Sequence, residues 1–161
     1  MQKKYWDYLV QVKSSVFYLD IYSENIYKST KKFEVICAIA SSASIGAWTV
    51  WTDLAYFWGL IIVVSQVLTS IKELFPFSKQ SKVLKQFSDE MKRIYDNMEH
   101  RWYEVADGKL TEEEINHLLF GFKKKVTELE IKYMSEDLVE KREYMLEADK
   151  KCNEYFIRNF G

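Results

Sequence analysis

Two long runs without a charged residue interrupt an otherwise mixed pattern of hydrophobic and polar positions. No Asp, Glu, Lys or Arg lies between Glu34 and Asp53, or between Asp53 and Lys72. Each run has about 18 uncharged positions, and an α-helix needs at least about 17 to cross the hydrocarbon of a bilayer. We therefore predict a transmembrane hairpin with a tight turn at Asp53. Its two spans are residues 33–52 and 54–72.

A pair of buried core helices in a soluble bundle is the alternative interpretation. The outward face of such helices normally carries a stripe of polar or charged residues. The polar residues of the two runs are mainly Ser and Thr with a single Gln, and no charged stripe is present. Because two consecutive charge-free helices are difficult to bury within 161 residues, the bilayer interpretation is preferred.

The flanks of the two runs carry the residues that favour membrane interfaces. Lysines precede the first span and follow the second, and the positive-inside rule then places both termini in the cytoplasm. We expect a multi-pass protein of the inner (plasma) membrane, with Asp53 outside. Aromatic rings prefer the headgroup region, and five lie around the predicted turn: Trp48, Trp51, Tyr56, Phe57 and Trp58.

Small residues recur at every fourth position of the first span, namely Ala38, Ser42 and Gly46. Small side chains allow helix backbones to approach closely, which promotes helix association in lipid. The contact lies either within the hairpin or between subunits, and the pattern favours neither alternative.

Gln66 is the most polar side chain inside either span, and an unpaired amide in hydrocarbon is costly. We predict that Gln66 bonds across to Ser41 or Ser42, or to another subunit. A pore-lining role is the alternative, in which the polar half of the second span would contribute Thr69 and Ser70.

The segment before the hairpin, residues 1–32, has a coiled-coil-like apolar stripe with alternating steps of four and three. No helix breaker separates it from the first span, which is compatible with one long continuous helix, but the pattern leaves open whether the helix continues into the span. Its dense aromatic residues are expected to pack on the C-terminal helices rather than on the membrane surface. The stripe consists of Tyr5, Leu9, Val12, Val16, Leu19 and Ile26.

The segment after the hairpin, residues 76–161, is predicted to form further helices of a bundle or coiled coil. Pro76 would end the second span or kink the chain at the membrane exit, and Ser78 would cap the next helix. Residues 106–109 predict a turn, and Thr111 and Glu114 have the spacing of a capping box. The predicted apolar stripes are Leu84, Phe87, Met91, Ile94, Met98 and Val105, and then Ile115, Leu119, Phe122, Val126, Leu129 and Tyr133.

Two alternatives remain beyond Tyr133, where the apolar register slips. Residues 135–137 mark a break, or the helix runs unbroken to about Ile157 and is near 70 Å long. An unbroken helix would exceed what the preceding helix covers, and its surplus face would need another subunit. The weaker stripe there is Met134, Leu138, Met145, Cys152 and Phe156.

The composition and the motifs of the sequence favour neither an enzyme nor a protein that binds nucleic acid. The formal net charge is −1, so no direct nucleic-acid partner is expected. No phosphate-binding, dinucleotide-binding or nucleophile motif occurs, so no enzyme activity and no cofactor are expected. A metal site or a disulfide is not expected either, because the two histidines stand alone and Cys37 and Cys152 are far apart in sequence.

The segments KKFEVICAIASSASIGAWTVW and LAYFWGLIIVVSQVLTSI, followed by helices from Ser78 onward, resemble the SLATT class of bacterial proteins with two transmembrane helices and a helical cytoplasmic region. The resemblance implies an all-α effector of antiphage defence (abortive infection). A separate sensor protein would trigger it, and a homo-oligomer assembled in the lipid bilayer would then perturb or permeabilise the membrane. The alternative is a non-conducting membrane scaffold that recruits a partner through its cytoplasmic helices.

Overall fold

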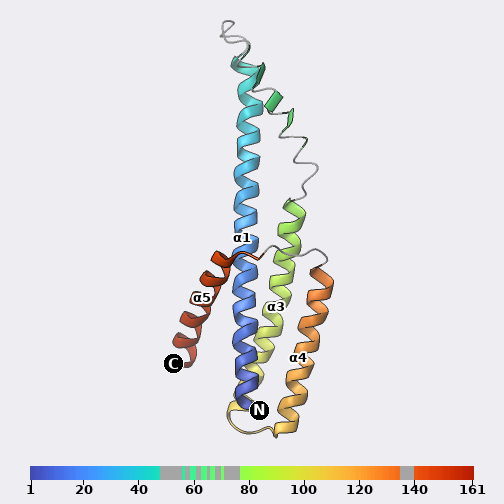
Figure 1. Cartoon of the computed structure of the whole chain (residues 1–161), viewed down its shortest axis with the longest axis vertical. Coiled ribbons are helices and arrows are strands. Elements are labelled where there is room, and N and C mark those ends of the chain that lie inside the picture. The colour runs from blue at the N-terminus through green and yellow to red at the C-terminus, as the bar shows by residue number, and fades with distance from the viewer. Residues whose placement is uncertain are drawn as a thin grey trace. The chain divides into compact units, whose positions relative to one another are not determined.

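The structure is a computed structural model that describes residues 1–47, 56, 59–60, 63–64, 66–67, 70, 77–134 and 140–161; the side chains of 40–47 and 77–79 are not described. These residues confirm the all-α fold (Figure 1). The helices are α1 (Gln2–Ala47), α3 (Phe77–Ala106), α4 (Glu112–Tyr133) and α5 (Arg142–Phe160).

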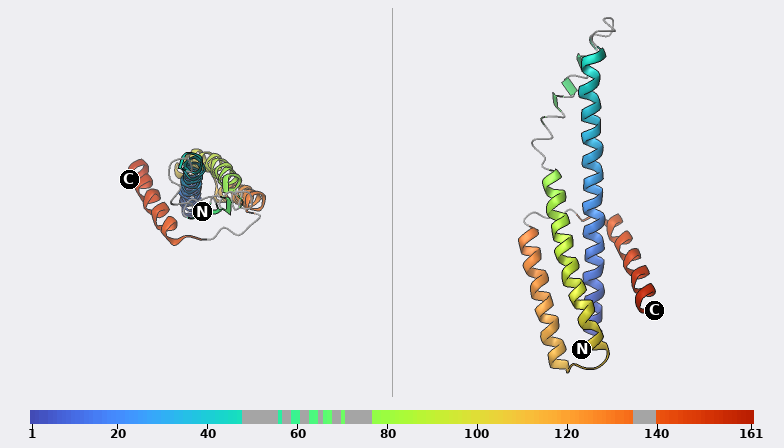
Figure 2. Two further views of the ribbon diagram at one scale, coloured as in Figure 1. Left: turned by 90° about the horizontal axis from the view of Figure 1, so that it is seen from above. Right: turned by 180° about the vertical axis from the view of Figure 1, so that it is seen from behind.

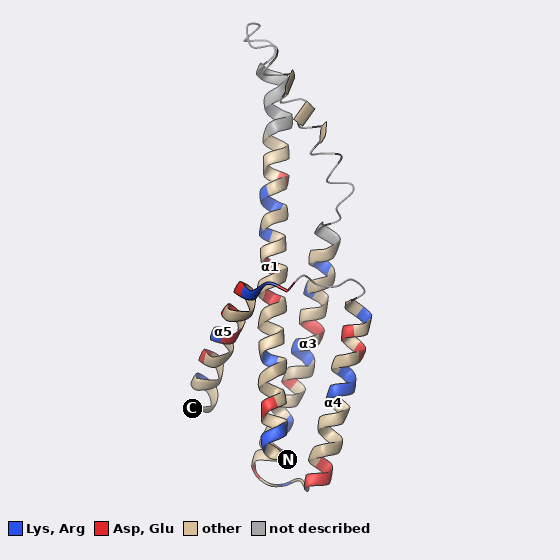
Figure 3. Ribbon diagram, viewed as in Figure 1, with Lys and Arg blue, Asp and Glu red and all other residues tan. Residues whose placement is uncertain are grey.

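The chain divides into two compact units. The first unit consists of Met1–Ser23 and Lys82–Gly161, and the second of Glu24–Ser81. Charged residues occur along every helix of the first unit, whereas the described part of α1 beyond Glu34 carries none (Figure 3). Within the described residues, no helix has a stretch that is both long enough and apolar enough to span a bilayer. Part of the predicted hairpin, including its turn at residues 48–55, lies outside these residues.

α1 is one continuous helix of 46 residues, about 69 Å long at a rise of 1.5 Å per residue. The question that the sequence pattern left open is answered as far as Ala47, because the helix of the N-terminal segment continues into the first uncharged run. The physical reason is the lack of helix breakers, since proline is absent from this stretch and its first glycine is Gly46.

The N-terminal half of α1 supplies the centre of the first unit. Its predicted stripe is confirmed from Tyr5 to Leu19, whose members are at most 4% exposed, while Ile26 is half-buried. α4 and α5 lie on opposite sides of this half of α1 (Figures 1 and 2). The aromatic residues of α1 pack on the C-terminal helices as expected, for example Trp6 on Trp102 of α3 and on Phe156 of α5.

The stripe predicted for α3 is confirmed except at one position. Ile94 is half-buried, and its neighbour Tyr95 is 1% exposed. The next buried residue of the stripe after Met91 therefore lies four positions further along α3, and not three. Tyr95 is favoured there because its ring packs 6.1 Å from that of Tyr155 in α5, and its hydroxyl donates to Glu99.

Two further details of α3 and α4 differ from the sequence-based expectation or refine it. α3 begins at Phe77, so Ser78 lies inside its first turn and is not the residue before the helix, which corrects the predicted cap. In α4, Ile115, Leu119, Phe122 and Val126 are buried as predicted, whereas Leu129 and Tyr133 are half-buried.

The turn between α3 and α4 has the predicted chemistry. Gly108 has φ +69°, a backbone conformation that favours glycine. The N–H of Gly108 donates to the Val105 carbonyl at 3.2 Å and that of Lys109 to the Glu104 carbonyl at 3.1 Å, which is the Schellman pattern. The capping box is also confirmed: the N–H of Glu114 donates to Thr111 Oγ1, and the N–H of Thr111 donates to Glu114 Oε2.

Replacing Thr111 by alanine is expected to lower the free energy of unfolding by about 1 kcal/mol, because the N–H of Glu114 loses its acceptor. Urea denaturation followed by circular dichroism measures the change. Thr111→Ser keeps the hydroxyl and serves as the control. A loss of the same size in both variants would show that the methyl group, and not the cap, is responsible.

The alternative of a break after Tyr133 is confirmed, and the unbroken helix of about 70 Å is wrong. α4 ends at Tyr133, and α5 begins at Arg142. The long helix with an uncovered apolar face, which was the reason to expect another subunit, is therefore not present. The weak stripe is also wrong in part, because Met134 and Met145 are each 44% exposed and Ala148 is buried beside Cys152.

Candidate functional site

The residues predicted to act in the membrane are only partly described. Ala38, Ser42 and Gly46 all belong to α1, but only the side chain of Ala38 is described, and it is exposed. Gln66 is exposed, and the hydroxyl of Ser70 donates to its backbone carbonyl at 3.0 Å. Tyr56 is 97% exposed. The side chains of Ser41, Thr69, Trp48, Trp51 and Trp58 lie outside the description, so the proposed partner of Gln66 stays a prediction.

Large apolar side chains of the second unit are exposed rather than buried. Their exposed fractions range from 48 to 63%. Soluble proteins rarely expose contiguous apolar surface of this kind without a function for it. The set, called the exposed apolar set below, is Val35, Ile36, Ile39, Leu60, Val63, Val64 and Val67.

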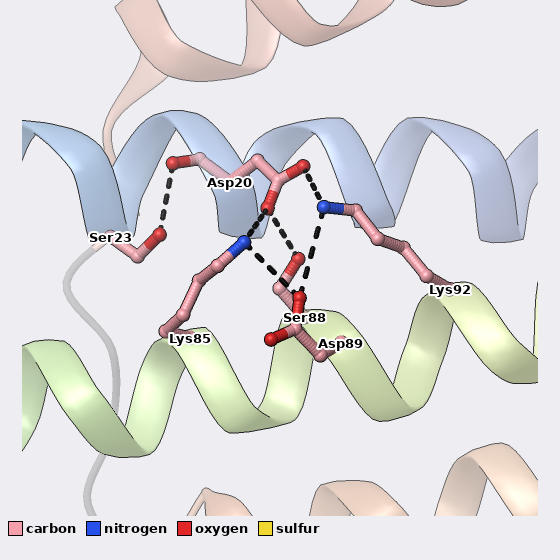
Figure 4. Close-up of polar contacts among 6 residues, drawn as sticks. All are labelled: Asp20, Ser23, Lys85, Ser88, Asp89 and Lys92. Atoms are coloured by element: carbon pink, nitrogen blue, oxygen red, sulfur yellow. Dashed lines mark hydrogen bonds and ion pairs between the residues drawn. The ribbon is translucent and has the colours of Figure 1, made fainter.

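A half-buried polar network joins α1 to α3 in the first unit (Figure 4). The Asp20 carboxylate of α1 accepts hydrogen bonds from Ser88 Oγ at 2.6 Å and from Lys92 Nζ at 2.6 Å. Lys85 Nζ lies 3.5 Å away and bridges to Asp89 at 3.1 Å. Ser88 is completely buried, so Asp20 is the acceptor that makes the burial of this hydroxyl tolerable.

Burial raises the pKa of Asp20, but the hydrogen bonds from Lys92 and Ser88 and the charges of both lysines lower it by more. The net pKa is therefore below its usual value. A carboxyl group whose pKa is lower in the folded state stabilises the fold above its unfolded pKa of about 4. That contribution is lost as the pH falls through the folded-state pKa.

Asp20→Asn is expected to lower the free energy of unfolding at pH 7 by about 1–3 kcal/mol, because the lysines lose a charged acceptor. The difference from the parent should shrink as the pH falls below about 4. Denaturation curves at several pH values measure it. Asp89→Asn is the matched control, since Asp89 pairs with the same lysines but is 51% exposed, and exposed pairs contribute little. An equal loss in both variants would contradict the assignment.

A second polar cluster ties α5 to α1 and α3. Lys13 Nζ of α1 lies 4.0 Å from the ring centre of Tyr95 and 3.7 Å from that of Tyr155. The hydroxyls of both tyrosines donate to Glu99 Oε1, at 3.0 and 2.6 Å. Burial lowers the pKa of Lys13, and the carboxylate of Glu99 opposes that shift. The cation between two rings and the shared acceptor hold three helices in register.

A groove runs along the N-terminal half of α1, between α4 and α5. Its main cavity has a volume of about 420 Å³. The buried side chains of its floor are Leu19, Phe87, Met91 and Ala148, and Met134 and Met145 flank them. Three carboxylates complete the wall: Glu130, Glu140 and Asp149. We call this feature the α4–α5 groove.

Two further features of the described residues concern metal binding and thiol reactivity. Among them, no group of three or more His, Cys, Asp and Glu is close enough to hold a metal ion. Cys152 is buried, its thiol donates to the Val10 carbonyl at 3.6 Å, and burial raises its pKa, which disfavours the reactive thiolate.

The sequence-based reasoning missed the polar clusters and the groove. A signal for the clusters was present, because Lys13 and Asp20 are seven residues apart and adjoin the apolar stripe at Val12 and Leu19. Charges at helical spacing along an apolar stripe indicate buried partners on the neighbouring helix. No comparable signal marks the groove, whose lining comes from four helices.

Comparison of the chain with models of protein families, with curated proteins and with solved structures gave no match.

Proposed function

We propose that the chain is an oligomeric membrane effector that perturbs or permeabilises the bacterial inner membrane when triggered. In this proposal the uncharged runs form a transmembrane hairpin, and the first unit lies in the cytoplasm with both termini. The single observation that carries it is the exposed apolar set, which belongs to the same charge-free stretches that are long enough to span a bilayer.

The energetics favour lipid as the surrounding of these side chains. Full burial of a Val, Leu or Ile side chain is worth about 1.5–3 kcal/mol relative to water. The exposed apolar set has seven members, so leaving all of them in water would forgo a free energy comparable to the stability of a domain. The first unit also exposes single apolar residues, such as Phe120, Ile131 and Ile157, but most of its apolar stripe residues are buried, and its exposed residues lie on helices that also carry charges.

Self-association is supported by the first span. Lipid tails supply no hydrophobic driving force between helices, so close approach of small side chains becomes the main source of attraction. Ala38, Ser42 and Gly46 provide such a face on α1. A role in antiphage defence, with a separate sensor protein as trigger, is supported by the resemblance to the SLATT class.

Inducible expression in bacteria tests the function directly. The parent chain should resist extraction of membranes with alkaline carbonate, arrest growth and depolarise the membrane, as reported by a potential-sensitive dye. Gly46→Leu should weaken both the self-association and the depolarisation while leaving the chain in the membrane. A chain that is released by carbonate, or that leaves the membrane potential unchanged at high expression, would contradict the proposal.

A second candidate is a non-conducting membrane scaffold that recruits a partner through its cytoplasmic helices. The α4–α5 groove is the observation that favours it, because it offers a docking surface on the first unit. The dye measurement separates the two candidates, since a scaffold binds its partner without depolarising the membrane.

A further inference from the structure

The α4–α5 groove has an apolar floor, and its walls carry methionine and acidic side chains. Its floor side chains are at most 4% exposed. Met134, the residue that follows α4, and Met145 of α5 also line the main cavity, and each is 44% exposed. Methionine side chains are unbranched and adapt to irregular apolar surfaces, and they are frequent at surfaces that accept helical segments.

The carboxylates of the groove lack cationic partners within the described part of the chain. Neither Glu130 nor Glu140 takes part in an ion pair there, and Asp149 accepts a hydrogen bond from Ser14 Oγ at 2.8 Å without a basic neighbour in contact. No Lys or Arg lines the main cavity. The main cavity therefore has three carboxylates and no basic lining residue around an apolar floor, which favours a cationic occupant.

The groove is longer than its main cavity. A second cavity of about 260 Å³ adjoins it and shares the lining residues Ser15, Met91 and Glu130. Along α1 the combined lining runs from Tyr8 to Leu19, about 16 Å at 1.5 Å per residue. This length corresponds to about three turns of a helix lying along α1, with α4 as a side wall throughout and α5 as the opposite wall at the main cavity only.

We propose that the α4–α5 groove binds an amphipathic helix of a partner protein that carries Lys or Arg beside an apolar stripe. The apolar stripe packs on the floor between Met134 and Met145, in the manner of a helix in a groove. The basic residues of the partner gather over the end at Leu19, where the carboxylates are, because the other end carries Lys123. This docking depends on the first unit and holds for either function proposed above.

Methionine signals provide a readout that distinguishes the groove from the rest of the molecule. The chain has five methionines, of which Met91, Met134 and Met145 line the groove while Met1 and Met98 do not. The full chain, labelled with ¹³C at the methionine methyl groups in neutral detergent micelles, is titrated with a helical peptide of Leu and Lys about 14 residues long. The three groove signals should shift and those of Met1 and Met98 should not.

Charge variants test the complementarity. Glu130→Lys/Glu140→Lys should weaken the binding at least about tenfold, because two attractions become repulsions. The matched control is Glu143→Lys/Glu154→Lys, which changes two exposed carboxylates of α5 that do not line the groove, and its affinity should equal that of the parent. Thermal melting of each variant verifies that the first unit is folded.

Four results would overturn the proposal. The first is an equal shift of all five methionine signals, and the second is equal binding of a peptide of Leu and Glu. The third is the same shift of the groove signals with spermidine alone, which would make the ligand a small organic cation. The fourth is a change of the groove signals with protein concentration in the absence of peptide, which would assign the groove to a second copy of the chain.

Discussion

Replacing Tyr5 by alanine is expected to lower the free energy of unfolding by about 3–5 kcal/mol. Tyr5 is completely buried, and its ring lies 6.1 Å from that of Trp102 and 6.3 Å from that of Phe122. It therefore joins α1 to both α3 and α4 at one point. A domain has only about 5–15 kcal/mol of stability, so this variant should lose a large part of its cooperative unfolding transition. Chemical denaturation followed by circular dichroism measures the loss.

Two control variants separate the contributions at this position. Tyr5→Phe keeps the ring and removes only the hydrogen bond to the Met98 carbonyl, which is 2.9 Å long, so it should cost about 1 kcal/mol. Tyr103→Ala removes a tyrosine ring that is 57% exposed and should cost less than about 1 kcal/mol. If Tyr5→Ala cost no more than Tyr103→Ala, the position of α1 at the centre of the first unit would be wrong.

The first unit was predictable where a local pattern determines the structure. The alternation of four and three steps located the buried face of α1, and turn and capping residues located the connection between α3 and α4. Both follow from backbone geometry and from contacts within a few residues. The break after Tyr133 was left open because charged and apolar positions are mixed there, and periodicity alone does not end a helix.

The remaining features depend on contacts that are distant in sequence. Tyr95 replaces Ile94 in the core because Lys13, more than eighty residues earlier, and Tyr155, sixty residues later, surround its ring. The burial of Ser88 depends in the same way on Asp20. The α4–α5 groove arises from the placement of four helices, and no single helix carries a pattern that indicates it. The Gln66 contact and most of the interfacial aromatic residues lie outside the described residues and stay predictions.

Two lysines introduced into the exposed apolar set should remove the chain from the membrane if lipid surrounds it. Val63 and Val67 are 61 and 52% exposed, and in the predicted second span their spacing of four would place them on one face of the helix. Val63 falls at the middle of the predicted second span, where one lysine costs about 2.5–3.5 kcal/mol. Val63→Lys/Val67→Lys should therefore cost about 5 kcal/mol, which corresponds to more than about a thousandfold in partitioning. Carbonate extraction and the potential-sensitive dye measure the effect.

The matched control introduces the same charges on the first unit. Val83 of α3 and Ile131 of α4 are also exposed apolar residues, at 40 and 75%, but the proposal places them in water, where a lysine costs little. Val83→Lys/Ile131→Lys should therefore remain in the membrane and depolarise it like the parent. If both double variants behaved alike, exposure of apolar side chains would carry no information about lipid. A parent chain that stayed monodisperse in buffer without detergent would have the same consequence, because the exposed apolar set would then be covered by protein.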